Sequence, residues 1–366
     1  MNRVVITGMG AISGEIKPTT VFDASALITD KFGEIDGLDK DNRLYDVIRR
    51  TVGDMLGDAG LTSSDVSAYG SDCRMFFGTL FARDKTYIEH SRSGADTLAM
   101  MNEFAVYAAS LAGVRGSVDI SSSSCAAGTT AIGMAFDFIR NGLCSYAVAG
   151  GAEELTPMGG FGFNALKALS SGVCNPYDVK HNGINIGEGG AFFMLETLES
   201  AQARNAKIYC EIIGFASGND AYHPTSPEPT GEEAYHLMWN ALDDAGISAE
   251  QLDYINGHGT GTVLNDSMET KALKKLYDDA ERKPFVSSTK ALVGHCMGAS
   301  GAVELASVIR SMRTGEPIVM PNLTEPLDGC ELYNAPEHID IEYAMSNSFG
   351  FAGNSASIVI RRWADE

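Results

Sequence analysis

The sequence predicts an α/β layered fold that consists of two related halves. Short apolar strands alternate with helices along the chain, which is typical of layered α/β proteins. A strand that runs into a turn and then into a helix of small residues occurs at 118–141 and again at 285–315. Because this unit appears twice, we expect an internally duplicated fold with two glycine-rich helices near a pseudo-twofold axis. The two halves are expected at residues 1–200 and 201–366.

The elements of the first half follow from hydrophobic patterning. Strands are predicted at 4–10, 75–79, 118–121, 146–153 and 190–198, and helices at 42–60, 98–112 and 126–141. Residues 81–94 give no assignable pattern. The glycines after the first strand have GxGxxxG spacing, and residues 15–20 with Pro18 do not favour a helix, so the dinucleotide-binding fingerprint GxGxxG is absent.

Composition narrows the class of protein. The formal net charge of −21 disfavours nonspecific binding to nucleic acid and to anionic membranes, because both require a positive surface. No run of about 18 apolar residues occurs, and the first residues form a strand pattern instead of a signal peptide, so we expect a cytoplasmic protein. The seven cysteines form no CxxC pair, which argues for free thiols and against a disulfide framework or a zinc site.

Cys125 is the candidate nucleophile. It lies where the predicted strand 118–121 ends and a helix of small residues begins. At such a turn, outward-facing N–H groups and the positive end of the helix dipole are expected to lower the pKa of a thiol. From this stretch alone, a buried structural cysteine is an equally good interpretation.

Two histidines are candidate partners of this cysteine. His258 follows a predicted strand and opens the run HGTGT at 258–262, in which glycines allow close backbone approach and hydroxyls can bind an extended ligand. His295 lies in the second strand-turn-helix unit and is expected to face Cys125 from the other half. A cysteine and two histidines at strand-to-loop junctions of related units favour nucleophilic catalysis over three unrelated structural residues.

Several motifs in a fixed order resemble one enzyme family. Ser124-Cys125-Ala126, HGTGT at 258–262, Ser288-Thr289-Lys290 with Gly294-His295, and Asn347-Ser348-Phe349-Gly350-Phe351 occur in this order along most of the chain. They are similar to the motifs of elongating β-ketoacyl–acyl carrier protein synthases, the ketosynthases of the thiolase superfamily. The resemblance implies a thiolase-like duplicated αβαβα layered fold.

The resemblance also implies a reaction, a decarboxylative Claisen condensation in fatty-acid or type II polyketide elongation, including an aryl-polyene-like pathway. Cys125 would take an acyl group from a carrier-protein phosphopantetheine, and a malonyl thioester would then lose CO2. His258 and His295 would stabilise the enolate through Nε2 donors. No resident cofactor is implied, since both substrates arrive on an acyl carrier protein, and the family forms homodimers or heterodimers with a related subunit.

Supporting roles are likewise implied by the resemblance. Lys290 would keep the second histidine neutral, and Glu304 would bind Lys290. The backbone N–H groups of Cys125 and Phe351 would form an oxyanion hole for the acyl group, with Phe351 as a gate and Phe349 flanking the pocket. Contacts to the pantetheine arm are expected from Thr225, Thr260 and Thr262.

A local basic patch for an acidic carrier protein is a separate hypothesis. Lys167 aligns with a basic residue near the tunnel mouth of the family, and Arg49 and Arg50 lie on the polar side of the first predicted helix. The hypothesis is motivated by the charge of −21, which otherwise repels an acidic partner.

The sequence departs from the family at three places. Ala352 stands where the gate loop usually has glycine, so a positive φ there would strain it. Asn185-Ile186 replace larger apolar or aromatic residues. The chain is also some tens of residues shorter than members of the family usually are, and we expect the missing residues to fall before Cys125. Because those residues form much of the floor of the acyl pocket in the family, the resemblance implies no particular acyl chain length.

Three alternative functions follow from the same residues. A chain-length-factor-like partner would lack the nucleophile, whereas Cys125 and both histidines are present. A thiolase would need a second cysteine near the C-terminus, and none follows Cys330. An initiating synthase would carry asparagine in place of one histidine.

Overall fold

The computed structural model describes residues 1–81, 98–278 and 280–364. Within these ranges, ten strands form one continuous sheet and two further strands form a small ribbon, β2 (Glu15–Pro18) and β3 (Lys31–Glu34). The segment 81–94, for which no secondary structure was predicted, lies almost entirely outside the described residues.

The large sheet contains the same arrangement of strands twice. From its centre outward, the first half reads β1 (Val4–Ser13), β7 (Gly189–Thr197), β6 (Tyr146–Glu153), β4 (Cys73–Gly78) and β5 (Val118–Ser121). The second half reads β8 (Cys210–Asn219), β12 (Asn354–Arg362), β11 (Tyr343–Phe349), β9 (Tyr254–Asn256) and β10 (Phe285–Ser287). Going outward, two antiparallel pairings precede two parallel ones in each half, and antiparallel pairing of β1 with β8 joins the halves.

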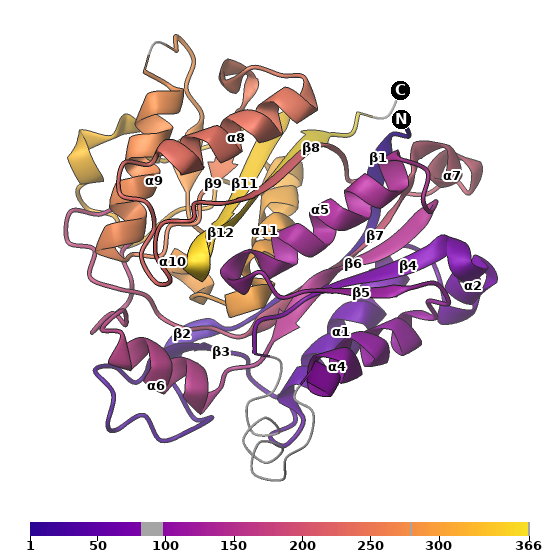
Figure 1. Cartoon of the computed structure of the whole chain (residues 1–366), viewed down its shortest axis with the longest axis horizontal. Helices are drawn as coiled ribbons and strands as arrows, with labels where there is room; N and C mark the ends of the chain where they lie inside the picture. Colours follow the sequence, from indigo (N-terminus) through magenta and orange to yellow (C-terminus); the bar gives the residue numbers. More distant parts are fainter. Residues whose placement is uncertain (82–97, 279, 365–366) are drawn as a thin grey trace.

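Helices complete a five-layered arrangement. The central pair, α5 (Ala127–Arg140) and α11 (Ser300–Thr314), lies between the two halves of the sheet, and one apolar core joins these helices to strands of both halves (Figure 1). On the outer face of the first half, α1 (Arg43–Asp58) and α4 (Leu98–Ala112) enclose a second core. On the outer face of the second half, α8 (Glu232–Ala245) and α9 (Val263–Leu276) enclose a third. The predicted duplicated α/β layered fold is therefore confirmed.

Small residues let the central helices approach their neighbours closely. A Cβ at Gly128 of α5 would lie 3.0 Å from the backbone nitrogen of Ala302 in α11. A Cβ at Gly133 would lie 2.1 Å from the ring of Phe215 on β8, a distance that real side chains do not adopt. The glycines of the predicted helix 126–141 thus have a packing reason.

The remaining α-helices within the described residues are short. They are α2 (Ser63–Ala68), α6 (Pro157–Ala165), α7 (Leu198–Ala203) and α10 (Lys290–Val293). The boundary that we predicted at residue 200 falls within α7, which continues directly from β7. We infer that the two halves meet in the connection between Ala203 and Cys210. None of the helices formed by the described residues combines the length and hydropathy that a bilayer span requires.

Candidate active site

Cys125 lies in a single 3-10 turn, η2 (Ser124–Ala126), between β5 and α5. The turn is tight enough that Ser124 adopts a left-handed conformation with φ of 52°. The cysteine is 5% exposed and lines a cavity of about 350 Å³ whose walls come from both halves of the chain. The strand-to-helix position that the sequence predicted for the nucleophile is therefore present.

Both predicted histidines reach the sulfur. His258 lies two residues after the end of β9. The backbone of His295 pairs with the segment around Ile186, accepting the N–H of Gly187 and donating to the carbonyl of Asn185. Cys125 Sγ and one nitrogen of each imidazole lie within 4.8 Å of one another. The two rings are perpendicular, with centroids 5.4 Å apart. Three buried side chains from both halves thus converge on one point.

Hydrogen bonds fix the protonation of both rings. The backbone N–H of Met297 donates to Nδ1 of His295 at 2.9 Å, and the ammonium of Lys290 lies 3.2 Å from Nδ1 of His258. An N–H group and an ammonium can only donate, so each Nδ1 must accept. In the neutral rings the hydrogen is consequently on Nε2, which makes both Nε2 atoms hydrogen-bond donors.

Lys290 is held in place by buried acceptors. It is 1% exposed and forms an ion pair with Glu304 of α11, which is also buried. Asn256 on β9 connects this pair to the strand, because its amide lies 3.4 Å from Glu304 and its carbonyl accepts the hydroxyl of Thr289 at 2.8 Å. The predicted contact between Lys290 and Glu304 is confirmed, and the contact between Lys290 and His258 adds a second partner.

The electrostatics of the site favour neutral imidazoles. Burial lowers the pKa of His258 and of His295 well below the usual histidine value, and the positive charge of Lys290 lowers both further. This agrees with the predicted effect of Lys290 on the second histidine. Both rings are therefore neutral at physiological pH, and each can donate one hydrogen bond from its Nε2–H group.

The prediction of a low cysteine pKa was wrong. Burial raises the pKa of the Cys125 thiol to about 11, although Lys290 and the backbone N–H of Phe351 both favour the thiolate. The sequence argument considered the turn and the helix dipole but not the loss of solvent around a sulfur enclosed by both halves. In this chain, desolvation is the largest effect.

The same trio is poorly suited to a metal ion. A cysteine and two histidines within 4.8 Å can in principle bind zinc. A histidine ligand, however, needs a lone pair on the nitrogen that faces the ion, whereas the donors at both Nδ1 atoms place hydrogen on Nε2. The arrangement suits a developing negative charge instead, such as the oxygen of a thioester.

Residues 350–354, the loop that the resemblance implies is a gate, line the cavity. Gly350 approaches so closely that an added Cβ would lie 3.0 Å from the backbone nitrogen of Cys125. Phe351 lines the cavity and stacks on Phe163 of α6 with ring centroids 5.5 Å apart. Ala352 has φ of 58°, which confirms that this position requires the left-handed conformation usually taken by glycine. Its N–H donates to the carbonyl of Pro224 at 2.8 Å.

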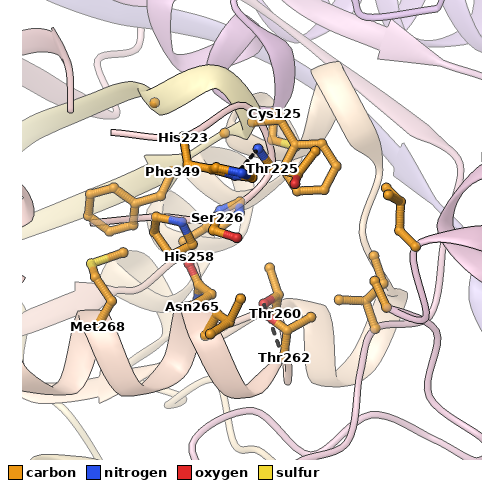
Figure 2. Close-up of a pocket in the computed structure, with 18 of the residues that line it drawn as sticks. Cys125, His223, Thr225, Ser226, His258, Thr260, Thr262, Asn265, Met268 and Phe349 are labelled. Atoms are coloured by element: carbon orange, nitrogen blue, oxygen red, sulfur yellow. Dashed lines mark hydrogen bonds between the residues drawn. The ribbon is translucent and has the colours of Figure 1, made fainter. Parts of the chain in front are cut away.

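The predicted threonines also line the cavity. Figure 2 shows Thr225 on the loop before α8, and Thr260 and Thr262 before α9, with Phe349 beside His258. The hydroxyls of Thr260 and Thr262 lie 2.8 Å apart. The centroid of Phe349 is 6.2 Å from that of His258. The three threonines thus line the same cavity as Cys125.

Two acids that sequence analysis missed hold the HGTGT loop. Glu269 accepts the backbone N–H of His258 at 2.7 Å and that of Gly259 at 2.9 Å, and Asp266 accepts that of Gly261 at 3.2 Å. Both acids are on α9 and fully buried. Their spacing of three residues, just after the loop, places them on one helix face and was a signal that could have identified them.

Phe163 was missed as well. It comes from α6, which the sequence analysis did not predict, and its neighbours are mostly glycine, so no hydrophobic periodicity indicated its position.

The three residues of the proposed basic patch are in different places. Lys167 is exposed, follows α6 and lines the cavity. Arg49 and Arg50 are on α1, are absent from the residues that line the cavity, and both form ion pairs with Asp46. Of these three residues, Lys167 alone lines the cavity.

The chain matches two halves of one known family. Residues 34–201 match "Beta-ketoacyl synthase, N-terminal domain" and residues 209–324 match "Beta-ketoacyl synthase, C-terminal domain". The chain therefore belongs to the beta-ketoacyl synthase family.

Individual relatives agree with this assignment. A 3-oxoacyl-[acyl-carrier-protein] synthase 2 of Coxiella burnetii is 34% identical over 99% of both chains. The synthase of the same name from Staphylococcus aureus strain COL is 38% identical over 69% of this chain, and this match spans 63% of the relative, less than two thirds of its length.

Solved structures extend the similarity to the whole fold. A beta-ketoacyl synthase from Burkholderia phymatum superposes with a TM-score of 0.87, at 29% identity and full coverage of both chains. A type II polyketide ketosynthase in complex with its acyl carrier protein gives 0.87 at 26% identity, and covers 99% of this chain and 100% of that one. These similarities confirm the predicted thiolase-like ketosynthase fold.

Proposed function

We propose that the protein is a 3-oxoacyl-acyl carrier protein synthase that catalyses a decarboxylative Claisen condensation. The observation that carries the proposal is the convergence of Cys125 Sγ with two neutral imidazoles whose Nε2 atoms carry hydrogen. Transfer of the acyl group to the enzyme needs a nucleophilic sulfur. Formation of an enolate from a thioester needs hydrogen-bond donors that stabilise the enolate oxygen. The site supplies both within 4.8 Å.

The first half-reaction transfers the acyl group. The sulfur of Cys125 attacks the thioester carbonyl of an acyl carrier protein, a new C–S bond forms, and the carrier's pantetheine thiol leaves with the proton. The N–H of Phe351 donates toward the sulfur, and Cys125 lies at the start of α5. We assign the oxyanion hole of this step to the backbone N–H groups of these two residues.

The second half-reaction forms the new carbon–carbon bond. The malonyl thioester loses CO2, and the electron pair of the broken bond forms an enolate whose oxygen accepts hydrogen bonds from His258 and His295. The enolate carbon then attacks the acyl-Cys125 carbonyl, and the C–S bond breaks to free the cysteine. Lys290 supports this step through Nδ1 of His258 and through its pairing with Glu304.

The proposed partner is an acyl carrier protein whose pantetheine arm contacts Thr225, Thr260 and Thr262 along the cavity. The named relatives act in acyl-carrier-dependent synthesis, and one similar structure is an assembly of a ketosynthase with a chain length factor. We accordingly propose fatty-acid or type II polyketide substrates and a homodimer or a heterodimer with a related subunit. No resident cofactor is needed for any step, and we place the enzyme in the cytoplasm.

A non-catalytic chain-length-factor role is disfavoured by the intact trio. A thiolase is disfavoured because Cys125 is the sole cysteine among the described residues that line the cavity, whereas Cys330 is packed in the outer core of the second half.

Intact-protein mass spectrometry tests the acyl transfer. The full chain is incubated with acyl carrier proteins that bear saturated acyl groups of different lengths, and the modified peptide is then identified. We expect a mass increase of one acyl group on Cys125 and none in Cys125→Ala, which keeps the other six cysteines. Acylation that persists in Cys125→Ala would contradict the proposal.

A further inference from the structure

Ser300 contacts the active site from behind His295. It is the first residue of α11 and is 2% exposed. Its hydroxyl oxygen lies 3.2 Å from Nδ1 of His295. This is the ring nitrogen opposite the Nε2–H that is available as a donor in the cavity.

The direction of this hydrogen bond follows from its neighbour. The N–H of Met297 donates to the same Nδ1 at 2.9 Å, so this nitrogen carries no hydrogen and offers an acceptor lone pair. The hydroxyl of Ser300 must therefore donate. Nδ1 of His295 thus receives two neutral donors, whereas Nδ1 of His258 receives one charged donor, Lys290.

Helix capping does not explain the position of this serine. The cap residue of α11 is Ala299, and no side chain caps this end. A serine inside a helix commonly donates to the carbonyl one turn earlier, as Ser307 of the same helix does to Val303 at 3.0 Å. Ser300 is directed to the histidine instead.

We propose that Ser300 is a positioning residue that orients His295 and strengthens its Nε2–H as a donor to the enolate oxygen. A donor at Nδ1 polarises the ring, because hydrogen bonds in a chain reinforce one another in a buried site. The hydroxyl of Ser300 donates to Nδ1 of His295 as a neutral group, in the same way that Lys290 donates to Nδ1 of His258 as a charged group. This inference rests on the proposed function, since it assigns Ser300 to the half-reaction that uses His295.

The test compares Ser300→Ala with Ser307→Ala in the full chain. Both variants remove one hydroxyl from α11, but the hydroxyl of Ser307 donates to the backbone carbonyl of Val303 in its own helix. CO2 release from malonyl carrier protein is measured in a Cys125→Gln background, which isolates decarboxylation, and acyl transfer to Cys125 is measured separately. Losing one neutral hydrogen bond is expected to slow CO2 release about fivefold in Ser300→Ala. We expect acyl transfer by Ser300→Ala, and both reactions of Ser307→Ala, to stay within about twofold of the wild type.

The outcomes separate this inference from the proposed function. An equal loss in both half-reactions would indicate a general structural defect and would overturn the role of Ser300, as would unchanged CO2 release. Failure of the chain with serine at position 300 to release CO2 or to become acylated would contradict the proposed function itself.

Discussion

At the scale of single residues, burial decides the chemistry of the site. Cys125, His258 and His295 are all nearly inaccessible, so each favours its uncharged form. Sequence analysis predicted all three residues from motifs, and the family resemblance implied that Lys290 and Glu304 support them. The predicted direction of the shift in the thiol pKa was wrong. Desolvation depends on how both halves enclose the sulfur, and no local sequence pattern indicates this.

The raised thiol pKa gives a testable pH dependence. Since the pKa of Cys125 is raised to about 11, its thiolate fraction is expected to keep rising with pH beyond the value at which an ordinary cysteine is fully ionised. We predict that the rate of alkylation by iodoacetamide at Cys125, read by peptide mass spectrometry, increases from pH 7 to 10 without a plateau. A plateau at or below pH 10 would contradict the effect of burial, and unfolded protein serves as the control.

At the scale of elements, the site depends on α9 as much as on the loop that carries the motif. Glu269 and Asp266 bind the backbone of the HGTGT run and so place His258. The three-residue spacing of these acids indicates that they share one helix face, but the sequence does not show that this face of α9 contacts the loop. The left-handed φ at Ala352, in contrast, followed from the residue that the motif usually has there.

Glu269 makes stability depend on pH in a defined direction. Burial raises its pKa from 4.5 to about 7, so between these values the unfolded chain has released a proton that the folded chain retains. Stability from this group is present below pH 4.5 and is lost as pH rises toward 7. We predict that Glu269→Gln, which cannot titrate, removes this slope, and that it also lowers the free energy of unfolding by about 1–3 kcal/mol because one N–H of the loop loses its acceptor.

Urea denaturation at several pH values measures both effects. Glu337→Gln is the control, since Glu337 is exposed. The account of the loop would be wrong if the difference in stability between wild type and Glu269→Gln stayed constant from pH 4.5 to 7.

At the scale of the whole molecule, duplication explains why the fold was predictable and the surface was not. The repeated strand-turn-helix unit implied two halves, and the pairing of β1 with β8 places their central helices together (Figure 1). Each half supplies part of the site, with Cys125 from one and the two histidines from the other. Surface roles such as the basic patch depend on which exposed residues become neighbours, and sequence spacing does not give this.

Carrier binding is predicted to depend on Lys167. It is the sole lysine or arginine among the described residues that line the cavity, which also include Asp220, Glu228 and Glu233. Lys167→Glu is expected to raise KM for an acyl carrier protein several-fold at low salt, and the difference should shrink at high salt because ions screen exposed charges beyond about 10 Å at 0.1 M. Arg49→Glu is the matched comparison, and we expect a smaller effect because Asp46 already pairs with that charge.

Steady-state kinetics at several salt concentrations provide the test. The electrostatic role of Lys167 would be refuted if the loss in Lys167→Glu stayed the same at every salt concentration, or if no loss occurred.

The central claim divides the labour between one sulfur and two imidazoles. The measurement that tests it most directly is the simultaneous detection of CO2 and 3-oxoacyl carrier protein from malonyl and acyl carrier proteins, with wild type and Cys125→Gln side by side. We predict equal amounts of both products from the wild type, and CO2 without the condensed product from Cys125→Gln, because His258 and His295 stabilise the enolate without the thiol. A Cys125→Gln variant that folds but releases no CO2, or one that still forms the 3-oxoacyl product, would contradict the account.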